Sequence, residues 1–386
     1  MIAGHDDAPA VYPVRLRPTP LELASGLTFG ADDQAPRVQM RGAPHPRAAI
    51  EELLRAALAR PPCLVSFSGG RDSSSVLATA TAVARRDGLP LPIPTTLRFP
   101  GAPGADESEW QELVVRHLRL PDWDRIEIST ELDLIGPFSG AVLRRHGVLW
   151  PPFSYVHGPI LERAKGGTVL TGAGGDEALS RGAFSSCRGR GWLRRSNLTT
   201  LAVALAPRAV RRRRFAREPQ PPSPWLHRHV EAEVHRLGSE WRGRSPDRWD
   251  AAIAWWWRSR YRANVSASLD LLAADAGTTV VSVFVEPTVV GALCRHFGFR
   301  GPASRKAAVS ELFGDVLPPA LVQRTGKAFF DEAVLGERTM AFAAAWDGTG
   351  VDAALVDLDR LAEEWRRPKP DVRTALLLQH AWLSAI

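Results

Sequence analysis

Cysteine is scarce in this chain, with three among its 386 residues. Cys63, Cys187 and Cys294 lie far apart, so their spacing matches neither a disulfide framework nor a zinc site. No uninterrupted apolar run approaches the roughly 20 residues of a membrane-spanning helix. The N-terminus also lacks the basic-then-apolar order of a secretory signal peptide. These absences predict a reduced, cytoplasmic protein without a membrane partner.

Acidic residues are absent from residues 188–217, a segment that contains ten arginines. The whole chain has a formal net charge of +7, so removing these ten charges leaves the remainder at −3. Basicity is therefore local, which argues against a nucleic-acid partner. Two interpretations of the segment stay open: a solvated insertion, or a contact surface for an acidic peptide, a carrier protein or a phosphate backbone.

Proline, glycine and alanine are frequent in residues 1–45, where neither helical nor strand periodicity is evident. We predict an extended lead-in or linker remnant there, followed by a folded unit over residues 46–386. A basic insertion is predicted around residues 181–250. Apolar residues make up 45% of the chain and charged residues 24%, as in soluble globular proteins.

Strands and helices alternate in the first half of the folded unit. The predicted strands cover residues 62–67, 93–99, 124–128 and the start of 166–180. The predicted helices cover residues 46–60, 72–88 and 106–120. Asp106 and Glu109 have the spacing of a capping box at the start of the last of these. This alternation predicts an α/β fold with a parallel sheet flanked by helices, and the later patterns predict a helix-rich C-terminal half.

The predicted first strand runs into the sequence SGGRDSSS, residues 68–75, at the start of a helix. In a parallel sheet, ligands bind beyond the carboxyl ends of the strands, where a glycine-rich turn lets backbone N–H groups approach phosphate oxygens. Asp72 would repel a phosphate unless Mg²⁺ lay between them. The pattern therefore predicts a polyphosphate nucleotide bound with Mg²⁺. The predicted phosphate donors are Ser68, Gly69, Gly70, Ser73 and Ser74.

This turn resembles the SGGxDS loop, or PP-loop, of enzymes that split ATP into AMP and pyrophosphate, and it lacks the lysine of the common P-loop. The second glycine-rich turn, VLTGAGGDEAL over residues 169–179, resembles that of asparagine synthetases, β-lactam synthetases and the related lasso-peptide macrolactam cyclases. The resemblance implies that Asp176 joins Asp72 on Mg²⁺. It also implies that Leu97 and Gly172 contact the nucleotide.

The segment SRKAAVSELFGDVLPPALVQRTGKAFF, residues 304–330, is similar to a downstream part of the same family. The resemblance implies that Lys306 contacts the triphosphate and that Lys327 holds the reacting centre. Cations suit both positions, because pyrophosphate leaves as an anion and attack on an acyl-adenylate develops an oxyanion.

The chain departs from this family at two points. Asparagine synthetases begin with a glutaminase domain whose nucleophile is a cysteine directly after the initiator methionine, whereas Ile2 stands there in this chain. We therefore expect no glutamine hydrolysis by this chain. β-Lactam synthetases use a tyrosine and a glutamate to deprotonate the amine, and the matching positions hold Ala173 and Ser259. Neither is a base, so Glu177 or a substrate carboxylate takes this role, or catalysis has been lost.

The leading hypothesis is an AMP-forming carbon–nitrogen ligase that uses ATP and Mg²⁺. A small-molecule or peptide carboxylate would be adenylated with release of pyrophosphate, and an amine would then displace AMP, in natural-product or macrolactam biosynthesis. Two alternatives stay open: a tRNA-modifying enzyme with the same loop, and a non-catalytic ATP-binding component of a biosynthetic complex. The local position of the basic segment argues against the first of these.

Overall fold

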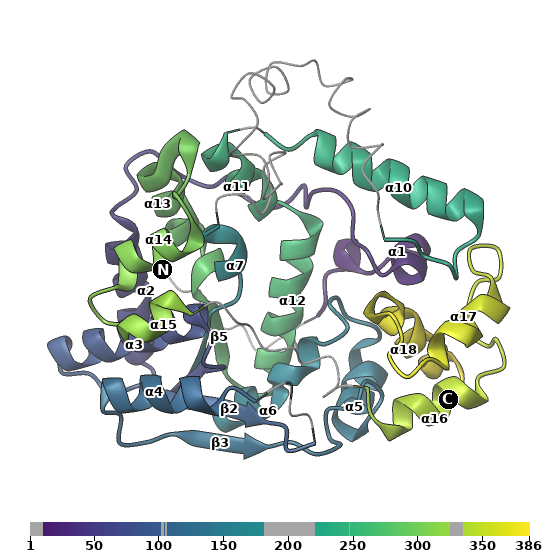
Figure 1. Ribbon diagram of the computed structural model, residues 1–386, viewed down its shortest axis with the longest axis horizontal. Coiled ribbons are helices and arrows are strands. Elements are labelled where there is room, and N and C mark those ends of the chain that lie inside the picture. The colour runs from purple at the N-terminus through teal and green to yellow at the C-terminus, as the bar shows by residue number, and fades with distance from the viewer. Residues whose placement is uncertain (1–10, 102–103, 105, 181–220, 247, 325–334) are drawn as a thin grey trace.

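A computed structural model gives the arrangement of the chain in space (Figure 1). It describes residues 11–324 and 335–386, apart from residues 102, 103, 105, 181–220 and 247. The arginine-rich residues 188–217 and Lys327 lie outside the described residues, so what the sequence implies for them stays a prediction. Within the described part of the chain, no helix has both the length and the hydropathy that a membrane span needs.

Five parallel strands form one sheet in the order β3-β2-β1-β4-β5. The strands are β1 (Cys63–Ser66), β2 (Ile93–Arg98), β3 (Asp124–Glu127), β4 (Thr168–Thr171) and β5 (Thr279–Ser282). β1 is central and pairs with β2 and β4, so the strands that lead into the two glycine-rich turns are neighbours. The predicted parallel sheet is confirmed. β5 was missed because it is a short edge strand that follows a long helical pattern.

Helices cover both faces of the sheet. Successive residues of a strand point to opposite faces, so alternate side chains pack against different helices. The covering helices are α2 (Pro46–Leu58), α3 (Arg71–Asp87), α4 (Ser108–Leu118), α6 (Gly158–Arg163), α12 (Arg260–Asp275), α13 (Pro287–Phe297) and α14 (Arg305–Phe313). Val65 and Leu170 share a core with α2, α3, α4, α13 and α14. Leu64 and Val169 pack instead with α6 and α12. This two-sided burial explains the apolar character of β1 and β4.

The helix after the first turn, α3, ends where the sequence predicts. Gly88 adopts the left-handed conformation that terminates helices, and its N–H donates to the carbonyl of Ala84. The next helix, α4, begins differently from the prediction. Asp106 accepts hydrogen bonds from both the N–H and the hydroxyl of Ser108. The predicted capping box between Asp106 and Glu109 is therefore wrong, because the turn before the helix already engages the Asp106 carboxylate.

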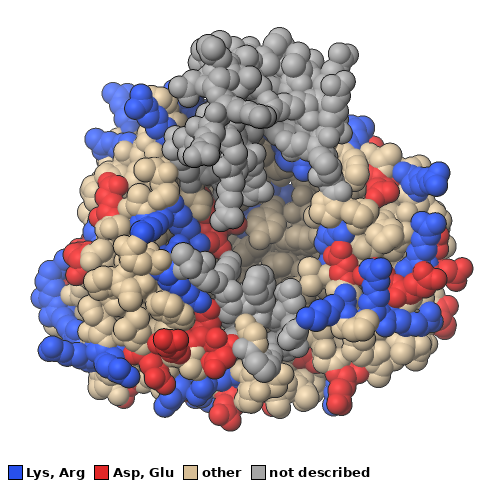
Figure 2. Space-filling model, viewed as in Figure 1, with Lys and Arg blue, Asp and Glu red and all other residues tan. Residues whose placement is uncertain are grey.

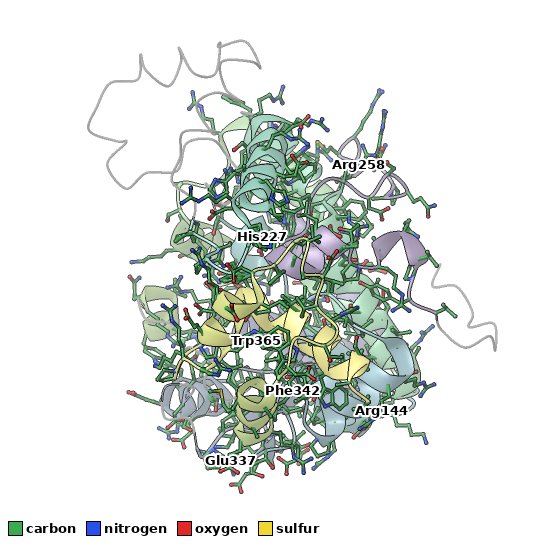
Figure 3. All side chains as sticks on the ribbon, turned by 90° about the vertical axis from the view of Figure 1, so that its right-hand side faces the viewer. Arg144, His227, Arg258, Glu337, Phe342 and Trp365 are labelled. Carbon is green, nitrogen blue, oxygen red and sulfur yellow. The ribbon has the colours of Figure 1, made fainter. Side chains whose placement is uncertain are left out.

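The C-terminal half is mostly helical, as predicted, and it contributes to a second core. The other long helices are α5 (Pro137–His146), α10 (Arg228–Gly243), α11 (Trp249–Trp257), α16 (Glu337–Ala345), α17 (Leu358–Trp365) and α18 (Ala375–Ser384). Trp365 is fully buried in this core, and its ring centroid lies 4.6 Å from that of Trp346. Figure 3 looks onto this side, where Trp365 and Phe342 come from α17 and its neighbour α16.

Part of the predicted lead-in is helical, contrary to the prediction of an extended segment. Helix α1 (Pro20–Ser25) begins with a capping box between Thr19 and Glu22. Glu22 also forms a buried ion pair with Arg260 of α12. Tyr12 is buried as well, and its hydroxyl donates to Asn264 at 2.9 Å. Tyr12 and Glu22 therefore tie the described part of the lead-in to α12.

Candidate active site

The predicted phosphate loop is a tight turn between β1 and α3. Ser68 Oγ lies 3.2 Å from Ser73 Oγ and accepts a hydrogen bond from the N–H of Gly70. Gly69 has a φ of +81°, and a Cβ there would press against the side chain of Gln111. The turn therefore requires glycine at residue 69. It places both serine hydroxyls at the N-terminus of α3, where anions bind favourably.

Side chains from α4 and from Arg324 hold the carbonyl oxygens of this loop. Gln111 donates to the Ser68 carbonyl at 3.2 Å, and Arg324 donates to the Gly69 carbonyl at 3.2 Å. Arg324 also forms an ion pair with Glu107, and both of these side chains are almost fully buried. Arg324 is thus anchored at the phosphate loop.

The second glycine-rich turn follows β4 and packs directly against the first. A Cβ on Gly172 would lie 2.7 Å from the backbone nitrogen of Ser73. Gly175 begins the short helix α7 (Gly175–Ala178), and a Cβ there would overlap the carboxyl group of Asp72. Although about 100 residues separate the two motifs in sequence, they form one site beyond the carboxyl ends of β1 and β4.

Asp72 and Asp176 converge on one guanidinium group. Arg305 Nη2 lies 2.7 Å from Asp72 Oδ2, and Arg305 Nη1 lies 2.5 Å from Asp176 Oδ1. The two carboxylates are thus close enough to share a cation, as the resemblance implies for Mg²⁺. Lys306, the cation named from the sequence, is exposed and forms no ion pair with any residue that the structure describes. Its neighbour Arg305 was missed.

Three arginines gather at the first turn. Arg71 Nη2 donates to the carbonyl of Arg324, and burial together with the charges of Arg305 and Arg324 lowers the pKa of Arg71. Burial acts in the same direction on Arg305, but the neighbouring carboxylates, Asp72 foremost, outweigh it and raise the pKa of Arg305. Such a concentration of positive charge beside a helix N-terminus favours a polyanionic ligand.

The residues present fit a nucleoside triphosphate bound together with Mg²⁺. Among the described residues, no group of three or more His, Cys, Asp or Glu side chains is placed to hold a metal ion alone. Mg²⁺ is, however, commonly bound by one or two carboxylates together with substrate phosphates, which matches Asp72 and Asp176. The hydroxyl of Ser74, one of the predicted phosphate donors, is buried and has no hydrogen-bond partner among the described residues.

A cavity of about 320 Å³ lies beside the first turn, at the carboxyl ends of β1 and β2. Its volume is in the range of small-molecule sites. The lining includes two predicted nucleotide contacts, Ser68 and Leu97, together with Phe99, Phe153 and His157. Burial lowers the pKa of His157, so its imidazole is neutral at pH 7. This mostly apolar cavity suits the flat base of a nucleotide.

Ser259 and Tyr261 lie at the start of α12, and Figure 2 shows one face of the molecule hollowed near its centre. Ser259 is buried, and its hydroxyl accepts a hydrogen bond from the N–H of Arg262 as the cap of α12. Tyr261 is 43% exposed. Partial burial, followed by the charges of Glu177 and Asp176, raises the pKa of the Tyr261 hydroxyl. Tyr261 therefore lies within electrostatic range of the acidic turn, which the sequence did not indicate.

A parallel sheet with this turn after its central strand, a base-sized cavity beside it and two converging carboxylates defines an α/β nucleotide-binding protein. The chain matches the family model described as asparagine synthase over residues 47–384, and it belongs to that family. Family membership supports a ligase that forms amide bonds with ATP, generally with Mg²⁺. No curated protein matches the chain.

Proposed function

We propose that this protein is an AMP-forming carbon–nitrogen ligase, which adenylates a substrate carboxylate and transfers the acyl group to an amine. The convergence of Asp72 and Asp176 beside the SGGRDS turn carries the proposal. Two carboxylates that share a cation next to a phosphate loop are what pyrophosphate release needs, because charge must be neutralised on the leaving group.

In the first half-reaction, the loop and the N-terminus of α3 bind the triphosphate of ATP. Bound Mg²⁺ would be held by Asp72 and Asp176 and would neutralise phosphate charge. A carboxylate oxygen of the substrate attacks the α-phosphorus, and the bond to the bridging oxygen of pyrophosphate breaks. Arg305 replaces Lys306 as the proposed triphosphate contact, because Arg305 reaches both carboxylates whereas the Lys306 side chain is exposed.

In the second half-reaction, an amine attacks the carbonyl carbon of the acyl-adenylate, the amide bond forms and AMP leaves. The amine must lose a proton, and Glu177 on α7 is the proposed acceptor. Tyr261 lies within electrostatic range of Glu177, so it is proposed to position the amine. Lys327 stays the predicted group for the oxyanion that develops during this attack.

We propose a small-molecule or peptide carboxylate and amine as substrates, with macrolactam formation in natural-product biosynthesis as one form of the reaction. The basic segment 188–217 is proposed to contact an acidic peptide or a carrier protein, since its ten positive charges are local.

Exchange of labelled pyrophosphate into ATP tests the proposal, with a panel of carboxylic acids and peptides. We expect exchange that depends on both the acid and Mg²⁺. Absence of exchange with every acid, together with intact nucleotide binding, would favour a non-catalytic component of a complex. Salt-sensitive tRNA binding that survives deletion of residues 188–217 would favour the tRNA-modifying alternative.

A further inference from the structure

Arg305 occupies an electrostatically unusual place in its helix. It is the first residue of α14, whose cap Ser304 accepts a hydrogen bond from the N–H of Ala307. A positive side chain at a helix N-terminus faces the positive end of the helix dipole, which is unfavourable. Its position must therefore be stabilised by groups outside the helix.

Those groups are the two carboxylates proposed to bind the metal ion. Asp72 comes from α3 and Asp176 from α7, and their contacts with Arg305 use one oxygen of each, Asp72 Oδ2 and Asp176 Oδ1. The exposed fractions of the side chains are 16% for Asp72, 45% for Asp176 and 26% for Arg305, so solvent screens the cluster only in part. Without a cation between them, like charges this close would repel each other.

We propose that Arg305 is an internal counter-ion, which competes with a divalent cation for Asp72 and Asp176. This inference rests on the proposed function. The guanidinium already engages the carboxylate oxygens that a metal ion would need, so the metal alone must displace it and binds weakly. A nucleotide changes this balance, because its phosphates offer Arg305 a new negative partner. Metal and nucleotide therefore bind cooperatively, and either one bound alone is disfavoured.

Lys306 provides a matched comparison. It is the next residue in the same helix and carries the same charge, yet its side chain is exposed. Consecutive residues on an α-helix point in directions about 100° apart. Replacing Lys306 therefore removes one positive charge from the neighbourhood without removing the contact to either carboxylate.

The experiment measures divalent-cation binding without nucleotide or carboxylic acid, by calorimetric titration of Mg²⁺ into the wild type, Arg305→Met and Lys306→Met. We expect Arg305→Met to bind Mg²⁺ at least about fivefold more tightly than the wild type, as for an ordinary coupling between two sites. Lys306→Met should bind as the wild type does. The double variant Arg305→Met/Asp176→Asn should lose the gain.

A second readout covers the case in which Arg305→Met folds poorly. Arg305→Lys keeps the charge but cannot span two carboxylates with one planar group, so it should show a smaller gain of the same sign. The rise in unfolding temperature on adding Mg²⁺ should follow the same order. Unchanged metal affinity in both Arg305 variants, or an equal gain in Lys306→Met, would overturn the inference. The Mg²⁺ titration contains no nucleotide, so its outcome does not depend on whether the protein catalyses pyrophosphate exchange.

Discussion

Arg324 and Glu107 form an ion pair across 217 residues of sequence, with exposed side-chain fractions of 7% and 6%. Glu107 is the cap residue of α4, and Arg324 donates a further hydrogen bond to the carbonyl of Gly69 in the phosphate loop. The Arg324 guanidinium also lies over the ring of Trp110, 4.9 Å from its centroid. The ion pair therefore holds the Arg324 side chain in place to bind the Gly69 carbonyl of the phosphate loop.

Glu107→Gln should reduce both the free energy of unfolding and the affinity for ATP. Removing one partner from a buried ion pair leaves an uncompensated charge and costs about 3–5 kcal/mol. Glu22→Gln is the control, since it breaks a buried pair with Arg260 that does not touch the loop. Denaturant unfolding and ATP titration of both variants separate the two effects. Equal loss of ATP affinity in both would contradict the role of Arg324 in holding the loop.

Asp72→Asn and Asp176→Asn should each slow pyrophosphate exchange at least about a hundredfold. Each removes a proposed metal ligand, and the bound metal stabilises the charge of the transition state by several kcal/mol. Asp124→Asn on β3 is the control, since that carboxylate pairs with Arg163 away from the loop. The measured quantity is the exchange rate at saturating ATP and Mg²⁺. A wild-type rate in Asp72→Asn would refute the proposed metal role.

Gly172→Ala should weaken nucleotide binding by pushing the two glycine-rich turns apart. The added Cβ would lie 2.7 Å from the Ser73 nitrogen, and overpacking of this kind costs about 1–3 kcal/mol. Gly101→Ala serves as the control, because a Cβ there meets no atom within 4 Å. Binding of ATP and thermal unfolding should be measured for both. If Gly172→Ala bound ATP as tightly as the wild type, the nucleotide would not need close contact between the turns.

His157 should make stability depend on pH in a defined window. Burial lowers its pKa in the folded state, so the unfolded chain takes up the proton first as the pH falls. The free energy of unfolding should therefore decrease as the pH drops below about 6.5, the usual histidine value, and this loss should end below the folded-state pKa. Above pH 7 the contribution is fully present.

Denaturant unfolding at pH 7.5 and at pH 5.5 measures this slope. His157→Gln should flatten it, whereas replacement of the exposed His117 on α4 should leave it unchanged. An unaltered slope in His157→Gln would mean that another group is responsible.

The first turn could be predicted from sequence because its signals are local. An apolar strand, a Gly–Ser turn and a helix that ends at Gly88 occur within 30 residues of one another, and the parallel sheet follows from the alternation of elements. The partnership of Asp72 with Asp176 was implied by the resemblance alone, and no local pattern indicated it. Local pattern did not single out Arg305, because its contacts with Asp72 and Asp176 depend on how α14 packs beside α3.

Other parts of the site come from tertiary packing. His157 precedes α6 and β4, Tyr261 lies on α12, and neither belongs to one of the two glycine-rich turns. Helix α1 has only six residues, and its local signal, a capping box between Thr19 and Glu22 with Pro20 at the first helical position, was overlooked. For Tyr261 the deciding proximity, to Asp176 and Glu177, lies outside any local window.

The large sequence separation between these bonded residues has a consequence for translation of the chain. Arg305 and Arg324 meet the turn near residue 70 only after most of the chain has been translated, since 233 and 255 residues separate the bonded partners. A nascent polypeptide on the ribosome has the acidic groups and the turn early, but lacks the basic groups that steady them. Competence to handle ATP should therefore appear late, close to chain release, and partial translation products should be inert.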